Sequence, residues 1–217
     1  MARTTDTLVS MLQAQPVVPV IVVDDAGSAV PLARALVAGG LKAIEITLRT
    51  PPALDAIRAI AAEVPEAIVG AGTILNARQY REAEAAGSKF IVSPGMTQEL
   101  LDASSKSDVP LLPGAATASE VMALVEEGYT MLKFFPAEQA GGAGYLKALS
   151  SPLAGVRFCP TGGVSAANAP DYLALPNVVC VGGSWVAPKN LVASGDWDAI
   201  TGLSSEAATL GTGTISV

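Results

Sequence analysis

A lysine, Lys133, interrupts an apolar run from Met131 to Phe135 that stops at Pro136. Burial in such a run takes water away from the amine and disfavours its charged form. An uncharged lysine amine is a nucleophile that forms a Schiff base with a ketone. The chain contains no histidine, so the usual general base and the commonest metal ligand are absent. The run predicts covalent chemistry at Lys133, although a lysine at a strand end is more often a solvated surface residue.

A second apolar run, from Ala43 to Arg49, carries opposite charges at Glu45 and Arg49. Alternate side chains of a strand share a face, so both charges are expected opposite Ile44 and Ile46, on the inner face. Ions in such a place are costly unless they are paired. Two interpretations remain open: a structural Glu–Arg pair, or a general acid/base beside an anion-binding arginine.

Two glycine turns each carry a neighbouring hydroxyl group. Gly162–Gly163 follows Thr161, and Gly182–Gly183 precedes Ser184. Glycine permits positive φ and close approach to a ligand, and backbone amides in such turns bind phosphate. One Gly-Gly pair usually marks only a tight turn, but two of them after consecutive strands indicate an anion site.

Short apolar runs rich in Val and Ile alternate with amphipathic, helix-like segments along the whole chain. We expect eight strands, at residues 17–23, 43–48, 68–71, 90–92, 109–112, 131–134, 156–159 and 178–181. This alternation implies parallel pairing with right-handed crossovers. It predicts an α/β fold, a (β/α)8 TIM barrel forming a single domain over residues 1–217. We expect an extra N-terminal helix at residues 3–14 and a loose tail at residues 211–217.

An open doubly wound sheet is the alternative fold. The residues after the first run, Val23–Gly27, lack the dinucleotide-binding glycine pattern that this fold usually carries there. In a barrel, active sites lie at the carboxyl ends of the strands, where Lys133 is expected. Thr73 shares strand parity with Val69 and Ala71, which we expect to bring its hydroxyl to the barrel mouth.

Helix starts and stops can also be predicted. Residues 117–120 read as a capping box. Asn76, Thr97 and Ser165 are predicted N-caps. Glycines 39–40, 87 and 128 fall where helices should end.

Composition limits the classes of function. The chain has 217 residues, 50% of them hydrophobic, and a net charge of −7, which argues against a nucleic-acid partner. No apolar stretch reaches membrane-spanning length, and residues 1–15 do not read as a signal peptide. Cys159 and Cys180 match no metal or redox motif, so we expect buried free thiols, no bound metal and a cytoplasmic location.

Six segments, taken in order, resemble those of a known family. They are residues 17–21, 45–50, 69–73, 133–138, 157–163 and 182–185. They are similar to the 2-keto-3-deoxy-6-phosphogluconate (KDPG) aldolases, class I Schiff-base enzymes of the Entner–Doudoroff pathway. The resemblance implies cleavage of this phosphorylated keto-deoxy sugar acid to pyruvate and D-glyceraldehyde 3-phosphate, without a cofactor, by a homotrimer.

The resemblance also implies roles for individual residues. Lys133 would form the imine with the C2 ketone, and Glu45 would shuttle protons. Arg49 and Thr73 would hold the carboxylate, helped by the backbone around Pro94. Thr161 and Phe135 would line the pocket. The residues implied to hold the 6-phosphate are Gly162, Gly163, Gly183 and Ser184.

Other functions compete with this one. The epimeric 2-dehydro-3-deoxy-6-phosphogalactonate is the closest rival substrate, and 4-hydroxy-2-oxoglutarate (KHG) cleavage is an expected side activity. A phosphate-binding barrel isomerase or epimerase would share the glycine turns, but it would not need Lys133 as a nucleophile. A non-catalytic binding module would need neither Lys133 nor Glu45.

Overall fold

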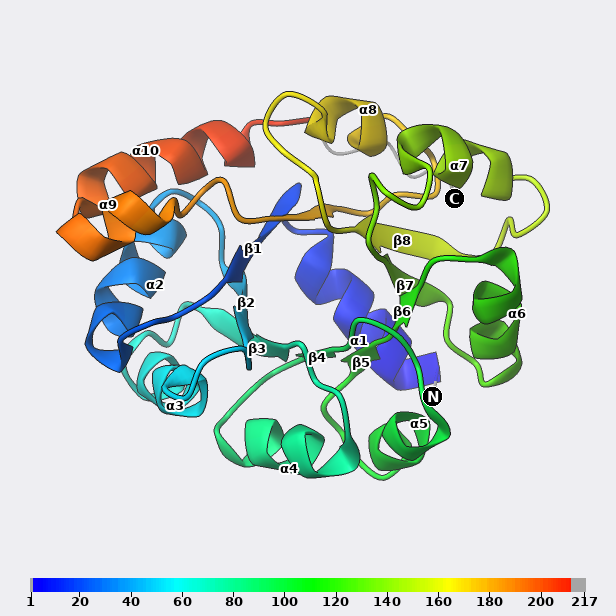
Figure 1. The fold of residues 1–217 in the computed structure, drawn as a ribbon, viewed down its shortest axis with the longest axis horizontal. Helices are drawn as coiled ribbons and strands as arrows, with labels where there is room; N and C mark the ends of the chain where they lie inside the picture. The colour runs from blue at the N-terminus through cyan, green and yellow to red at the C-terminus, as the bar shows by residue number, and fades with distance from the viewer. Residues whose placement is uncertain (1, 212–217) are drawn as a thin grey trace.

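The computed structural model describes the backbone of residues 2–211 and the side chains of residues 5–211. Strands form a ring at the centre and most helices lie outside it (Figure 1). The strands are β1 (Val17–Ile21), β2 (Ala43–Thr47), β3 (Ile68–Gly72), β4 (Ile91–Val92), β5 (Leu111–Leu112), β6 (Gly114–Ala115), β7 (Met131–Phe134), β8 (Arg157–Pro160) and β9 (Val181–Gly183).

Helices fill the connections between the strands. They are α1 (Ala2–Leu12), α2 (Ala29–Ala38), α3 (Ala53–Glu63), α4 (Ala77–Ala85), α5 (Gln98–Ser104), α6 (Ala118–Glu126), α7 (Gly142–Leu149), α8 (Ala169–Leu173), α9 (Lys189–Ser194) and α10 (Trp197–Ala208), with a 3-10 turn η1 (Ala26–Ser28) before α2. The predicted N-terminal helix is thus confirmed as α1. Residues 212–217 of the predicted tail lie outside the described residues.

The strands close into a barrel. One sheet has the order β5-β4-β3-β2-β1-β9 and the other the order β6-β7-β8, with parallel pairing. β5 and β6 are two parts of one extended segment divided at Pro113, which has no N–H to donate. Bridges from Phe158 to Val178 and from Thr161 to Gly182 close the remaining gap between β8 and β9. The predicted (β/α)8 barrel is confirmed.

Local predictions differ in their outcome. The capping box of α6 is present, and the side chains of Asn76 and Thr97 cap α4 and α5. The prediction of Ser165 as an N-cap is wrong. The Asn168 side chain accepts the N–H of Ser165 at 2.7 Å and so closes a turn before α8 begins at Ala169.

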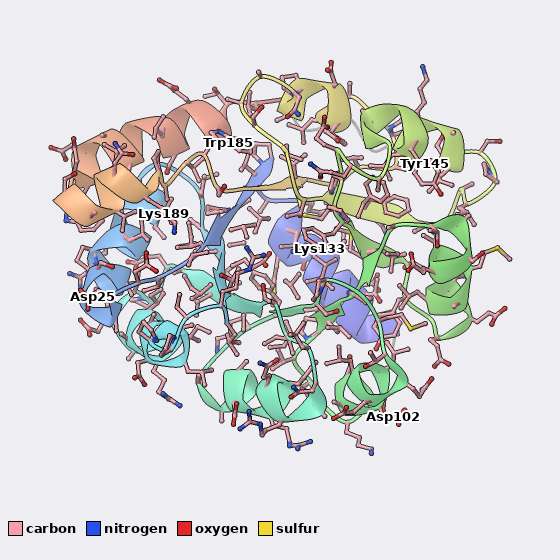
Figure 2. All side chains as sticks on the ribbon, in the orientation of Figure 1. Asp25, Asp102, Lys133, Tyr145, Trp185 and Lys189 are labelled. Atoms are coloured by element: carbon pink, nitrogen blue, oxygen red, sulfur yellow. The ribbon has the colours of Figure 1, made fainter. Side chains whose placement is uncertain are left out.

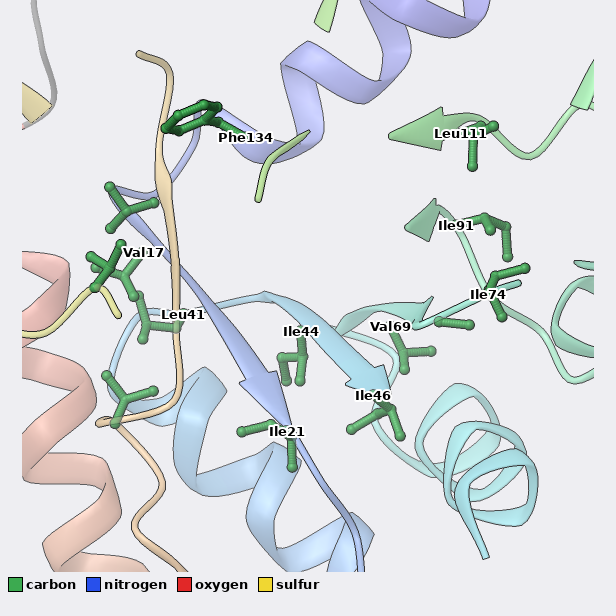
Figure 3. Close-up of a cluster of buried hydrophobic side chains, with 14 of the residues drawn as sticks. Val17, Ile21, Leu41, Ile44, Ile46, Val69, Ile74, Ile91, Leu111 and Phe134 are labelled. Carbon is green, nitrogen blue, oxygen red and sulfur yellow. The ribbon is translucent and has the colours of Figure 1, made fainter. Parts of the chain in front are cut away.

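The buried side chains form two layers. The larger layer fills the space between the strands and the outer helices, and Figure 3 shows part of it around Ile44, Ile46 and Val69. The smaller layer lies inside the barrel, where Leu8 and Leu12 of α1 pack with side chains such as Met131. Helix α1 therefore fills the barrel from its amino-terminal end and leaves the carboxyl ends of the strands open. No helix of the described part of the chain has the length and hydropathy needed to cross a membrane.

Gln15 joins β1 to β2 at the amino-terminal end of the barrel. Its buried side-chain amide donates to the carbonyls of Val17 and Ala43 at 2.7 and 2.9 Å. Its oxygen accepts the N–H groups of Lys42 and Ala43 at 2.7 and 2.8 Å. Both N–H donors and both oxygen lone pairs of this amide are used, so the side chain completes the backbone pairing where the ladder begins.

Replacing Gln15 should therefore destabilise the barrel. Gln15→Ala leaves buried backbone groups without partners, and we expect the free energy of unfolding to fall by about 2–4 kcal/mol. Urea unfolding measures this loss. The control is Gln13→Ala, because Gln13 is exposed two residues earlier, and it should change stability by less than about 0.5 kcal/mol. Equal effects of the two substitutions would show that the Gln15 bonds contribute nothing specific.

Candidate active site

A buried ion pair lies inside the barrel. Lys133 on β7 and Glu45 on β2 are 88 residues apart in sequence, and Lys133 Nζ is 3.4 Å from Glu45 Oε1. Their side chains are only 4% and 3% exposed. Figure 2 shows Lys133 near the centre of the ring. The alternative of a solvated surface lysine is therefore wrong for Lys133. The structural Glu45–Arg49 pair is also wrong, because Glu45 pairs with Lys133 instead.

Backbone pairing and missing side chains hold this pair in place. The Lys133 N–H donates to the carbonyl of Pro113 at 2.9 Å, and Lys133 is in register with Gly114 and Cys159. A Cβ at Gly72 would lie 1.9 Å from Glu45 Oε1. Gly72 therefore leaves the space that the Glu45 carboxylate occupies, which the sequence alone did not reveal.

Arg49 and Thr73 form a second polar pair at the carboxyl ends of β2 and β3. Arg49 Nε donates to Thr73 Oγ1 at 2.9 Å. The parity argument for Thr73 is wrong, because Val69 and Ala71 belong to the outer core. Thr73 lies beyond the end of β3 and has φ +58, outside the strand conformation, so strand alternation does not determine the direction of its side chain.

A cavity of about 530 Å³ opens beside these residues. Both glycine turns line it, together with Phe135, Trp185 and Arg49. The site residues predicted from sequence that line it are Arg49, Phe135, Thr161, Gly162, Gly163, Gly183 and Ser184. Lys133 and Glu45 do not line this cavity. The Phe135 ring does line it, and its centroid is 5.4 Å from Lys133 Nζ, so Lys133 lies next to the cavity wall.

Thr73 and Pro94 do not line the cavity. The carbonyl of Pro94 instead packs against Gly114, where a Cβ would lie 2.3 Å from the Pro94 oxygen. Gly114 is the register partner of Lys133 on the neighbouring strand. The backbone at Pro94 thus lies on the Lys133 side of the site rather than on the glycine side.

The first glycine turn is fixed from outside the cavity. Gly162 and Gly163 have φ +100 and +76. The carbonyl of Gly162 accepts the N–H of Glu138 at 3.1 Å, and that of Gly163 accepts Asn168 Nδ2 at 3.1 Å. With their carbonyls bonded away, the two residues can offer their amides to a ligand.

Tyr172 extends this support and was not predicted from the sequence. Its buried hydroxyl donates to the Glu138 carboxylate. Burial and this carboxylate raise the pKa of Tyr172 well above its usual range, so the phenol keeps the proton that it donates. Glu138 lies in a segment that carried the family resemblance, which is the one signal that marked it.

Metal-ligating side chains are not gathered here. Within residues 2–211 no group of three or more Cys, Asp or Glu side chains could hold a metal ion. Cys159 and Cys180 are buried free thiols in the inner layer. The neighbouring Cys159 thiol and burial raise the pKa of the Cys180 thiol, so it stays uncharged at neutral pH.

Comparison with known proteins identifies close relatives. The family model for KDPG and KHG aldolases matches residues 8–203. The chain is 56% identical to a 2-dehydro-3-deoxy-phosphogluconate aldolase of Pseudoalteromonas atlantica over 192 residues, covering 88% of this chain and 89% of the relative. It is 55% identical to a KHG/KDPG aldolase of Escherichia coli over 198 residues, covering 91% and 93%.

A solved structure of another family member has the same fold. KDPG aldolase from Legionella pneumophila, with pyruvate captured as a covalent carbinolamine intermediate, superposes with a TM-score of 0.91 at 45% identity, covering 93% of this chain and 98% of that one. The match of fold and sequence extends over nearly the whole chain. This chain therefore belongs to the KDPG and KHG aldolase family.

Proposed function

We propose that this chain cleaves 2-dehydro-3-deoxy-6-phosphogluconate to pyruvate and D-glyceraldehyde 3-phosphate as a class I aldolase, through a Schiff base on Lys133. The observation that carries the residue assignment is the buried Lys133–Glu45 pair beside a cavity with two glycine turns. Close relatives named as 2-dehydro-3-deoxy-phosphogluconate aldolases support the substrate. An isomerase or epimerase would not need this buried lysine.

Lys133 supplies the electrophile for bond cleavage. Its Nζ bonds to C2 of the substrate, and the ketone oxygen leaves as water, which gives a cationic imine. When the C3–C4 bond breaks, its electron pair moves into an enamine between C3, C2 and the Lys133 nitrogen. The imine thus accepts charge that would otherwise stay on C3. Water then hydrolyses the imine after C3 is protonated and releases pyruvate.

Glu45 moves the protons. Its carboxylate accepts the proton of the C4 hydroxyl as C4 becomes the aldehyde of glyceraldehyde 3-phosphate, and it later returns a proton to C3. Its position 3.4 Å from Lys133 Nζ supports this role, because the proposed imine forms at that nitrogen. In this proposal, a bound water carries the protons between Glu45 and the substrate.

Separate groups hold the two anionic ends of the substrate. Arg49 and Thr73, with the backbone around Pro94, hold the carboxylate. The amides of Gly162, Gly163 and Gly183, with the Ser184 hydroxyl, hold the phosphate. These assignments fit a substrate that is anionic at both ends, with the ketone between them.

Glu45→Gln tests the proton-transfer role. The amide keeps the shape of the side chain but cannot accept a proton, so exchange of the pyruvate methyl protons with solvent should fall about 100- to 10,000-fold. NMR of pyruvate in deuterated buffer measures this exchange. Imine formation should survive in part. Exchange near the wild-type rate would mean that Glu45 is structural and that another group moves the proton.

Gly163→Val tests the phosphate site. Valine at φ +76 is strained, and its Cβ would lie within 2.8 Å of Glu138, so the amides should move away from the phosphate. We expect kcat/KM to fall about 100-fold for the phosphorylated substrate and far less for KHG, which has no phosphate. The ratio between the two substrates is the readout, because a general folding defect lowers both values.

The matched control is Gly155→Val, because a Cβ at Gly155 meets nothing within 4 Å. It should leave the ratio of the two substrates unchanged. Equal losses on both substrates in Gly163→Val would place the phosphate site elsewhere.

Cleavage rates on the gluconate and galactonate epimers, measured side by side, test the preference at C4 of the substrate. The name of the E. coli relative, KHG/KDPG aldolase, supports KHG as a second substrate.

We also propose a homotrimer in the cytoplasm. The resemblance to family members supports the trimer, and two buried free thiols suit a reducing compartment. Sedimentation equilibrium would give a mass near three chains of 21.9 kDa each, and a monomer mass would contradict the proposal.

A further inference from the structure

Two neighbouring cavities differ in charge. The charged side chains that line the cavity beside the glycine turns are Arg49 and Lys189, both cationic. A second cavity, also of about 530 Å³, is lined by Asp24 and Asp25 as well as Lys189. The two cavities share Val22, Ala187 and Lys189. Lys189 therefore stands on the boundary between a cationic cavity and an acidic one.

Lys189 is held only weakly by its neighbours. Its Nζ lies 4.0 Å from Asp24 Oδ2, the limit for an ion pair, and the two side chains are 80% and 70% exposed. Exposed pairs of this kind contribute little stability. The long side chain can therefore leave Asp24 at small cost. In Figure 2, Lys189 is labelled between Trp185 and Asp25, on the side of the ring where the second glycine turn ends.

Position in the chain brings Lys189 close to the phosphate-binding turn. It is the first residue of α9 and follows Ser184 by five positions, and both line the same cavity. Arg49 lines the same cavity and donates a hydrogen bond to Thr73, just beyond the carboxyl end of β3. A substrate with a carboxylate at one end and a phosphate at the other would find one cation near each end.

We propose that Lys189 is a specificity-determining residue for the phosphorylated end of the substrate, and that it exchanges its contact with Asp24 for the phosphate when substrate enters. The inference rests on the proposed function and adds a basic side chain to a phosphate site otherwise built from amides and a hydroxyl. Asp24 and Asp25 repel a dianion from the second cavity, so the charges on the two sides of Lys189 direct the phosphate toward the glycine turns.

The exposure of the Lys189 side chain to solvent limits how much its replacement can change KM. A solvated charge near a dianion acts through a high dielectric and is screened by salt. Lys189→Gln should raise KM for the phosphorylated substrate about three- to tenfold at low ionic strength, with kcat nearly unchanged, and the difference should largely vanish near 1 M salt, where the Debye length is about 3 Å. Asp24→Asn should lower KM, because it frees Lys189.

The control for net charge is Lys147→Gln. Lys147 is exposed on α7 and lines neither cavity, so its replacement changes the total charge equally without touching the site. The experiment measures kcat and KM for 2-dehydro-3-deoxy-6-phosphogluconate in the wild type and the three variants, at low and high salt. Exchange of the pyruvate methyl protons, which involves no phosphate, is measured in parallel and should be unchanged in all of them.

The inference is overturned if Lys189→Gln changes KM no more than Lys147→Gln, if its effect does not depend on salt, or if Asp24→Asn raises KM. Loss of pyruvate exchange in Lys189→Gln would also overturn it, because the role would then be structural. Failure of the proposed function is distinct, since the wild type itself would then not cleave the phosphorylated substrate.

Discussion

The burial of one ion pair inside the barrel is the constraint on which the rest of the site depends. Lys133 and Glu45 are both almost inaccessible, so each needs the other to offset the loss of hydration. Removing one partner of such a pair typically costs about 3–5 kcal/mol, because an unpaired charge remains. The barrel accommodates the pair only because Gly72 has no side chain, and α1 fills the space beneath it with apolar side chains.

The buried ion pair and the residues that line the cavity are separate groups of side chains. Lys133 and Glu45 do not line the cavity, whereas Arg49, the two glycine turns and Ser184, which are proposed to bind the anionic ends of the substrate, do line it. Although the chain has a net charge of −7, the charged side chains that line this cavity are the cations Arg49 and Lys189. Local charge, rather than the total charge, therefore sets the electrostatic potential that a ligand meets there.

The alternation of strand-like and helix-like segments predicted the barrel. Period-two alternation predicted the inward position of Glu45, because that period is a property of the strand itself. The strand pattern failed where the strand ended, because Thr73 has a positive φ, which strand parity cannot show. The helix N-cap prediction also failed at one position, because Asn168 rather than Ser165 closes the turn before α8. Gln15 and Lys189 act through neighbours distant in sequence, so only the folded chain reveals their partners.

The central claim is that Lys133 bonds covalently to the substrate ketone. Borohydride reduces an imine to a stable amine, so treatment in the presence of pyruvate should inactivate the enzyme and add one pyruvate-derived mass to the peptide that contains Lys133. Mass spectrometry of the digested protein locates the label. Labelling at Lys42 or Lys147 instead, or full activity after reduction with pyruvate, would contradict the account.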